Sequence, residues 1–422
     1  MTEFTIASFN VKNLIGADQE YYRFESYTPE EHAWKQNWLA NQLLTMNADI
    51  VCFQEIFDKD ALQSVIDETN EASNELNEDV IPDKSKRYHR KAIFRKLGYE
   101  PYTKEQVFFA PNVNDGGAGK RRPGLAVLSR FGFEGTPEII QELDEPLVIN
   151  FPTAGYDSDE SAGSYTLECI SRPIIKAKIK IGNEVVTVFN CHLKSKLGEY
   201  IKPKGADFAP ESDLVHYLPA ARALGELRAM LRRTAEAYVL RKLIIEELKQ
   251  DNPVMVLGDF NDSEYSVSSS MIKGERAFKN YAWMRRHNAE HKGDRYTEQN
   301  DTMIRSQIEQ YQLQSAEMQF IEKSQRDMIY TSVFGGVYES IDQILMSQHF
   351  VKGSANNIGT MDCFSVFNDH ITDGAHAEAP YNKLASDHGQ IMAHMRLWLV
   401  PSFLIYTALR LKGGLEAFAR SN

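Results

Sequence analysis

An apolar run over residues 254–257 ends abruptly in Gly258-Asp259-Phe260-Asn261, so a carboxylate and a carboxamide follow a predicted buried strand. Residues two apart in an extended chain point to the same side, and Asp259 and Asn261 are therefore predicted to face one site. A carboxylate can hold a cation or a proton, and a carboxamide can hydrogen-bond a substrate oxygen. The pair is a candidate for chemistry if the rest of the chain supplies partners.

Other apolar, strand-like runs also end in polar side chains. An isolated Asp after Gly is usually a turn residue, and an isolated His is more often structural than catalytic, so each alone indicates little. The strand ends of a layered sheet meet at one rim, however, and the repetition predicts that these groups converge. The set comprises Asn10, Glu55, Asn190, His192, Asp259, Asn261, Asp342, Asp387 and His388.

This inventory fits phosphoryl chemistry. Carboxylates suit a hard divalent ion, which takes oxygen ligands. The sequence has neither the Cys/His spacing of a zinc site nor a G-x-S-x-G nucleophile elbow, which leaves water as the nucleophile. Water needs a general base, such as a His oriented by a carboxylate, and the developing phosphoryl charge needs Asn, His, Arg or a metal around it.

The elements that must position these groups alternate between buried strands and amphipathic helices. Strands are predicted over residues 5–11, 48–55, 106–110, 125–130, 169–179, 185–195 and 338–347, and helices over 31–44 and 220–250. This alternation is typical of a layered α/β enzyme. We expect a single domain over residues 1–400, with a polar, mostly helical insertion at about 263–337 and a helical tail over 401–422.

The composition is that of a soluble globular protein, with 422 residues, 42% hydrophobic and 25% charged. The net charge of −12 argues against broad coating of nucleic acid but leaves a nuclease possible. Cys52 and Cys191 are predicted to be small buried side chains rather than disulfide partners. We see no secretory signal and no apolar run that could insert stably in a membrane, which predicts a cytoplasmic protein, or an extracellular or periplasmic one if a signal was trimmed.

The order of the motifs resembles that of the endonuclease/exonuclease/phosphatase superfamily, the DNase I-like metal-dependent phosphoesterases, and is nearest to its bacterial nuclease-like members. The resemblance covers residues 5–398 and implies a four-layer α/β sandwich, in which helices flank two packed, mostly antiparallel mixed sheets. The motifs that carry it are Ser8-Phe9-Asn10-Val11, Phe53-Gln54-Glu55, Gly124 to Arg130, Asn190-Cys191-His192-Leu193, Gly258-Asp259-Phe260-Asn261, Ile341-Asp342-Gln343-Ile344 and Ser386-Asp387-His388.

The resemblance also implies a metal centre and an activated water. Glu55 would be the main ligand of Mg²⁺ or Mn²⁺, with Asn10 and Asp387 nearby. His388, paired with Asp342, would orient or deprotonate the attacking water. Whether one metal ion or two act is left open by the sequence.

At the scissile phosphate, the resemblance implies that Asp259 transfers a proton or positions the substrate, and that Asn261 hydrogen-bonds a phosphoryl oxygen. His192 would bind the phosphate and protonate the leaving oxygen. In the DNase I-like branch of the family, the histidine that matches His192 has a carboxylate partner. Asn114 or Asp115 is the candidate for that partner here. The substrate-binding residues would be Lys12, Arg172, Asn190 and Lys194, with Lys196 either beside the phosphate or simply solvated.

The leading prediction is a metal-dependent phosphodiesterase that acts as a nuclease on DNA or RNA. The modest basic content keeps open a lipid phosphodiesterase of sphingomyelinase type or a small-molecule phosphatase. An inactive scaffold, with residues 263–337 as a binding surface, is a third interpretation, but the intact polar set argues against it. No protein partner can be inferred.

Overall fold

Two packed sheets form the centre of the structure, a computed structural model that describes residues 1–79, 98–152, 161–198, 200–201, 217–274, 276, 298–322, 329–373, 375 and 384–398. The first sheet contains β1 (Thr2–Leu14), β2 (Ile50–Ile56), β3 (Val107–Ala110), β4 (Gly124–Ser129), β13 (Gly359–Phe367) and β14 (Gln390–Leu397). Its strand order is β13-β14-β1-β2-β4-β3. Only the β1–β2 pair is parallel.

The second sheet has the order β5-β6-β7-β8-β12-β9, and its β7–β8 pair alone is parallel. Its strands are β5 (Glu138–Pro152), β6 (Ser161–Ile181), β7 (Glu184–His192), β8 (Val254–Asp259), β9 (Gln314–Ser315) and β12 (Asp342–Met346). A small hairpin of β10 (Ser332–Phe334) and β11 (Val337–Glu339) precedes β12.

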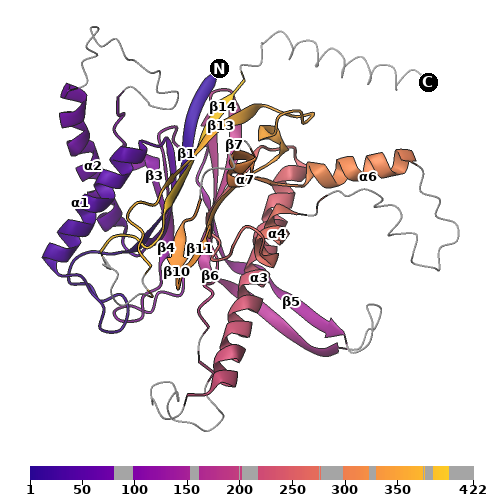
Figure 1. Cartoon of the computed structure of the whole chain (residues 1–422), viewed down its shortest axis with the longest axis horizontal. Coiled ribbons are helices and arrows are strands. Elements are labelled where there is room, and N and C mark those ends of the chain that lie inside the picture. The colour runs from indigo at the N-terminus through magenta and orange to yellow at the C-terminus, as the bar shows by residue number, and fades with distance from the viewer. Residues whose placement is uncertain are drawn as a thin grey trace.

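Helices cover the outer faces of both sheets, as Figure 1 shows with α1 and α2 on one side and α3 on the other. The α-helices are α1 (Pro29–Met46), α2 (Lys59–Asp79), α3 (Pro219–Lys249), α4 (Val267–Lys273), α6 (Glu298–Gln310) and α7 (Ala316–Ile321), and the short 3₁₀ turns are η1 (Lys104–Gln106) and η3 (Gln348–Phe350). Helix α1 begins at a capping box, in which Thr28 and Glu31 satisfy each other's backbone N–H groups.

Three apolar layers hold these elements together. The layer between the sheets includes Ile6, Val127 and Leu257. A second layer joins α1 and α2 to the first sheet, and a third joins α3 and α4 to the second sheet. Because both faces of each sheet are covered, the central strands are nearly continuously buried, as the apolar runs predicted. The predicted four-layer α/β sandwich of two mostly antiparallel mixed sheets is confirmed.

Residues 263–337 are more closely integrated than an insertion over one rim would be. The strand β9 forms the edge of the second sheet against β12, and Ala316 belongs to the core between the sheets. Residues 281–297 of this segment, and the predicted helical tail over 401–422, lie outside the described residues. No helix among the residues that the structure describes is long and apolar enough to cross a membrane.

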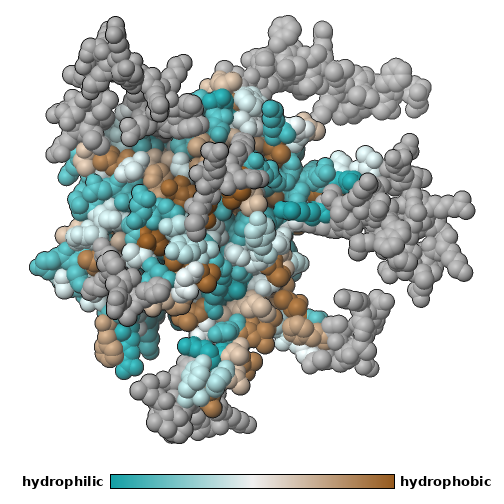
Figure 2. Space-filling model, viewed as in Figure 1, coloured by the Kyte–Doolittle hydropathy of each residue, from teal (hydrophilic) through white to brown (hydrophobic). Residues whose placement is uncertain are grey.

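The β5–β6 hairpin and the outer part of α3 expose apolar side chains, visible as brown surface in Figure 2. Among them are Val148, Phe151, Leu227 and Met230. A groove of about 560 Å³ lies between hairpin and helix. It is on the outer face of the second sheet, and therefore on the opposite side of that sheet from the core between the sheets.

Candidate active site

The site lies at one end of the apolar layer between the two sheets. Along β1, the side chains of Phe4 and Ile6 enter that layer, and with a period of two residues the same face continues to Ser8 and Asn10. The same alternation carries Met255 and Leu257 of β8 on to Asp259, Val188 of β7 on to His192, and Ile344 of β12 back to Asp342. Four strands thus present polar side chains at one end of a shared apolar core.

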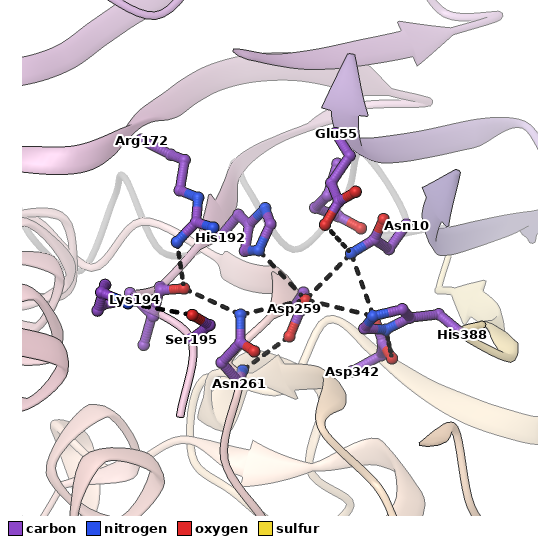
Figure 3. A network of polar contacts seen from close by, with 12 residues as sticks. Asn10, Glu55, Arg172, His192, Lys194, Ser195, Asp259, Asn261, Asp342 and His388 are labelled. Carbon is purple, nitrogen blue, oxygen red and sulfur yellow. Dashed lines mark hydrogen bonds and ion pairs between the residues drawn. The ribbon is translucent and has the colours of Figure 1, made fainter. Parts of the chain in front are cut away.

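Asp259 lies at the centre of these groups, as Figure 3 shows. Its Oδ2 atom accepts a hydrogen bond from Asn10 Nδ2 at 3.1 Å and lies 3.3 Å from His192 Nε2 and 3.8 Å from His388 Nε2. Burial and the nearby Asp342 carboxylate raise the pKa of Asp259 to about 7, although the His388 charge opposes the rise. A carboxyl with this pKa can accept or donate a proton near neutral pH.

Asp342 and His388 form a hydrogen-bonded dyad, with 2.9 Å between Asp342 Oδ2 and His388 Nδ1. Burial acts to lower the pKa of His388, but the charges of Asp342 and Asp259 outweigh it and raise that pKa well above its ordinary value. The side chain of Thr331 positions the dyad, because its Oγ1 atom accepts from the backbone N–H groups of Ile341 and Asp342. The charges of Asp342 and Asp259 therefore favour the protonated form of His388.

The pKa of His192 is shifted in the opposite direction to that of His388. Complete burial and the positive charge of Arg172 lower its pKa well below the ordinary value, so the imidazole is neutral. Its Nδ1 atom has no hydrogen-bond partner among the described residues. The carboxylate beside it is Asp259, since His192 and Asp259 are register neighbours on β7 and β8.

The predicted partners of His192, Asn114 and Asp115, are wrong. Asn114 donates to Cys169 Sγ, and Asp115 lies 3.7 Å from Arg121. Asn114 thus contacts a residue of β6, and Asp115 contacts a residue of its own loop. Parallel pairing of β7 with β8 instead brings Asp259 to His192.

Glu55 reaches the site by a departure from regular strand geometry. Its backbone is left-handed, with φ of 66°, where the pairing of β2 with β4 is irregular. Its carboxylate accepts from Asn10 Nδ2 at 3.3 Å and from the Asn13 backbone N–H at 3.0 Å. Without this turn, the alternation along β2 would direct residue 55 toward the helices, with Val51 and Phe53.

Asn261 also has a left-handed backbone, with φ of 52°, whereas the sequence predicted an extended conformation. It converges with Asp259 because the Asp259 carboxylate accepts from the Asn261 backbone N–H at 2.7 Å. The Asn261 Nδ2 atom donates to Leu193 O at 3.0 Å and to Asp259 Oδ2 at 3.3 Å. In this arrangement Asn261 holds the Asp259 carboxylate in place.

Asp387 and Lys12 lie beside each other at the edge of the site, with 3.6 Å between Lys12 Nζ and Asp387 Oδ2. Asp387 is exposed to solvent. Desolvation acts to raise its pKa, but the charges of His388 and Lys12 outweigh it and hold that pKa below its ordinary value. Asp387 is thus an available anion on the open side of the site.

Cationic side chains lie on the other side of Asp259. Arg172 donates to Leu193 O at 3.1 Å, and Figure 3 shows it beside His192. The Lys194 ammonium donates to Ser195 Oγ and Leu197 O, and Lys196 forms an ion pair with Glu339 at 2.7 Å. The charges of Arg172 and, to a smaller extent, Lys194 both act on the His192 imidazole.

Asn190 does not line the site, contrary to its predicted role in substrate binding. It is fully buried, its Nδ2 atom donates to Phe53 O and Ala126 O, and its Oδ1 atom accepts from Gln54 Nε2 at 2.8 Å. These bonds occupy the carboxamide and join the second sheet to the first. Asn190 therefore connects the two sheets directly beneath the site.

Lys35 was not predicted and is fully buried on α1. Its ammonium donates to Val11 O at 2.9 Å and Leu384 O at 3.1 Å, and so ties β1 to the segment that carries Asp387 and His388. Burial and the Lys12 charge lower the pKa of Lys35 to about 7. The signal in the sequence is a lysine one helical turn before Leu39, on the apolar face of the helix.

The donor set of this site fits a divalent cation. Glu55 and Asp387 offer carboxylate oxygens. The ligand atoms of Asp259, Asp342 and His388 form a second group within 4.8 Å of one another, in which His388 would bind an ion only after losing its proton. Burial raises the pKa of Asp259, and repulsion by the Asp342 and Glu55 carboxylates adds to the rise. A hard cation that takes oxygen ligands would offset that repulsion.

The two packed sheets and the carboxylate–histidine site between their ends define this protein as a phosphoesterase of the DNase I-like fold. It belongs to the endonuclease/exonuclease/phosphatase family, whose model matches residues 7–355. The chain matches none of the curated proteins.

Solved structures with a similar fold share little sequence with this chain. The human Nocturnin catalytic domain with bound sulfate is 13% identical, with a TM-score of 0.43 and coverage of 94% of this chain and 95% of that one. Truncated TDP2 of Caenorhabditis elegans is 13% identical, with a TM-score of 0.41 and coverage of 93% and 97%. A mannosyl-6-phosphatase of Bacteroides thetaiotaomicron is 14% identical, with a TM-score of 0.40 and coverage of 93% and 100%. What these proteins act on does not transfer to this chain.

Proposed function

We propose that this protein is a divalent-metal-dependent phosphodiesterase that cleaves nucleic acid, DNA or RNA, by attack of water. The observation that carries the proposal is the single carboxylate oxygen, Asp259 Oδ2, around which Asn10, His192 and His388 gather from three different segments. Such a cluster is costly to bury, and it unites a proton acceptor with groups that stabilise negative charge.

Asp259 accepts the proton of the attacking water, because a pKa of about 7 makes it an effective base near neutral pH. Asn261 holds its carboxylate through two hydrogen bonds. The His388 imidazolium, maintained by Asp342, faces the same place and stabilises the charge that develops on the phosphoryl oxygens. His192 is neutral and contributes a hydrogen bond to the phosphate rather than a positive charge.

Glu55 would hold Mg²⁺ or Mn²⁺, with Asn10 and Asp387 as further oxygen ligands. When bound, the ion supplies positive charge beside the phosphoryl group and lowers the pKa of a bound water. Glu55 is favoured over the Asp259, Asp342 and His388 cluster because a cation there would compete with the 2.9 Å hydrogen bond of the dyad.

A polymeric substrate is favoured by the position of the cationic side chains. Lys12 is on β1 of the first sheet, whereas Arg172 is on β6 of the second sheet and Lys194 follows β7, so positive groups stand on both sides of Asp259. A phosphodiester chain that crosses the site would meet a cation on either side of the scissile bond.

The test is Mg²⁺-dependent cleavage of plasmid DNA and of a single-stranded RNA by the purified protein. Cleavage is expected with the wild type and lost in Glu55→Ala and His388→Ala. Turnover of a choline-linked or sugar-linked phosphate, with no cleavage of either nucleic acid, would replace the nuclease proposal with one of a lipid or small-molecule phosphoesterase. Absence of both divalent-ion binding and all cleavage would support the scaffold interpretation.

A further inference from the structure

Helix α3 reaches the site through two buried charged side chains, Arg233 and Glu236. They are one helical turn apart and therefore lie on the same face of the helix. Glu236 is only 1% exposed and Arg233 only 7% exposed. Neither residue belongs to the cluster around Asp259, and burial of two charges on one helix face calls for an explanation.

Glu236 binds the backbone of two separate segments. One carboxylate oxygen accepts from the Ser171 N–H at 2.7 Å, and the other accepts from the Lys194 N–H at 2.8 Å. Arg232 adds a bond to the first oxygen at 3.2 Å and also donates to Ser171 Oγ. The carboxylate thus spans the segment just before Arg172 and the segment just after His192.

Arg233 also binds the backbone of Lys194, and it links α3 to a third segment. Its guanidinium donates to Lys194 O at 3.3 Å and to Asp262 Oδ2 at 3.0 Å. Asp262 immediately follows Asn261, and its carboxylate also accepts from Ser268 at 2.7 Å. Lys194 is therefore held through both its N–H, by Glu236, and its carbonyl, by Arg233.

The three segments held by α3 carry the phosphate-facing residues of the second sheet, namely Arg172, His192 and Asn261. Leu193 lies between them: its carbonyl accepts from Arg172 at 3.1 Å and from Asn261 at 3.0 Å, and its N–H donates to Asp259 O. A shift of the Lys194 backbone would therefore move Leu193 and all the groups bound to it.

We propose that Glu236 and Arg233 are positioning residues, which set the geometry of the phosphate-binding side of the site through the backbone of residues 171, 194 and 262. This inference rests on the proposed phosphodiesterase function of the same site. On the metal-binding side, Glu55 is on β2 and Asp387 lies in the segment before β14, and neither contacts Glu236 or Arg233 among the contacts of the described chain.

The test compares Glu236→Gln with Glu247→Gln. A glutamine at position 236 offers one acceptor oxygen for two backbone N–H groups and turns an NH₂ group toward the other. Glu247 is a matched control: it is on the same helix, is only 3% exposed, and accepts from Thr187 and Asn252 at the opposite end of β7 from His192. Both substitutions remove a buried carboxylate, but only one removes it from the phosphate side.

Two readouts separate positioning from general stability. Glu236→Gln is expected to weaken binding of inorganic phosphate, measured by calorimetry in Mg²⁺ buffer, by about tenfold or more, and to lower kcat about 100-fold, since small misplacements of bound groups have effects of this size. Its affinity for Mn²⁺ should remain that of the wild type. Glu247→Gln should lower the melting temperature while phosphate affinity and kcat stay unchanged.

Arg233→Lys gives an independent check, because it keeps the charge but loses the forked hydrogen bonds to Lys194 and Asp262. It should reproduce the loss of phosphate affinity in part. Unchanged phosphate affinity in Glu236→Gln, or an equal loss in Glu247→Gln, would overturn the inference, as would a wild-type protein that binds no phosphate. If the wild type binds phosphate in this way but cleaves no phosphodiester, the proposed function fails and the positioning role stands.

Discussion

Asp259 and Asp342 are directly opposite each other on neighbouring antiparallel strands, as register partners in the β8–β12 ladder. Like charges in this position are ordinarily destabilising. Here His388 lies against both, at 2.9 Å from Asp342 and 3.8 Å from Asp259, and shares its positive charge between them. The arrangement raises the pKa of His388 well above its ordinary value and leaves Asp259 with a pKa of about 7, which suits proton transfer.

Asp342→Asn should lower the pKa of His388, because the charge that holds the proton on its imidazole is removed. Activity should fall about 100-fold or more, the usual contribution of such a group. The pKa is measured by NMR titration of the histidine rings in metal-free protein. His349, which is paired with Asp251 at 3.2 Å, is the internal control and should titrate as in the wild type. An unchanged His388 titration would contradict the dyad.

Glu55→Gln should weaken Mn²⁺ binding by more than about tenfold, measured by calorimetry, because it removes the charge of the principal ligand. Asp342→Asn is the comparison variant and should retain an affinity within a few-fold of the wild type. A larger loss in Asp342→Asn than in Glu55→Gln would place the ion at the Asp259, Asp342 and His388 cluster instead.

Asn190→Ala should destabilise the protein without changing KM. The substitution removes the Asn190 bonds to the buried carbonyls of Phe53 and Ala126 and to Gln54 Nε2, which retains only its bond to Cys52 O, and this costs about 3 kcal/mol. The free energy of unfolding in urea and steady-state kinetics on the folded variant provide the measurement. A raised KM at unchanged stability would instead return Asn190 to the substrate-binding set.

Glu317→Gln should change how stability depends on pH. Burial raises the pKa of Glu317 to about 7 from 4.5 in spite of the Ser340 hydrogen bond. The native state therefore disfavours the ionised form, and stability is lost as pH rises from about 4.5 to about 7. The glutamine variant lacks this loss and should be more stable than the wild type above pH 7, by roughly 3 kcal/mol.

Chemical unfolding at several pH values measures this difference. The control is Glu322→Gln, at the end of the same helix and exposed, which should leave the pH profile unchanged. Equal stabilities of wild type and Glu317→Gln across the range would contradict the raised pKa.

The sequence predicted the layers and most of the central groups, because both depend on local patterns. The apolar run that ends in Asp259 and the one that begins at Asp342 become strands of a doubly covered sheet, and their polar ends meet where the sheets are packed. The left-handed turns at Glu55 and Asn261 could not be read from residue types, since only the bonds to Asn13 and Asp259 make these backbones favourable.

The sequence also does not show how far along its strand a polar side chain lies from the site. Asn190 and His192 are two residues apart on the same face of β7. The Asn190 carboxamide hydrogen-bonds to the opposite sheet, whereas the His192 imidazole lies beside Asp259. The partner of His192 depends on how two distant strands are aligned, and the role of Glu236 depends on where a long helix crosses the sheet. These are properties of tertiary packing rather than of any local pattern.

The proposed catalytic set is divided between the sheets: Asn10 and Glu55 come from one, and His192, Asp259 and Asp342 from the other. During refolding, hairpins and helices can form while these two parts remain apart, so recovery of circular dichroism is expected to precede recovery of turnover. Catalysis would then report the time at which the two sheets dock, and a substrate-based stopped-flow assay would follow that single late event without any added label.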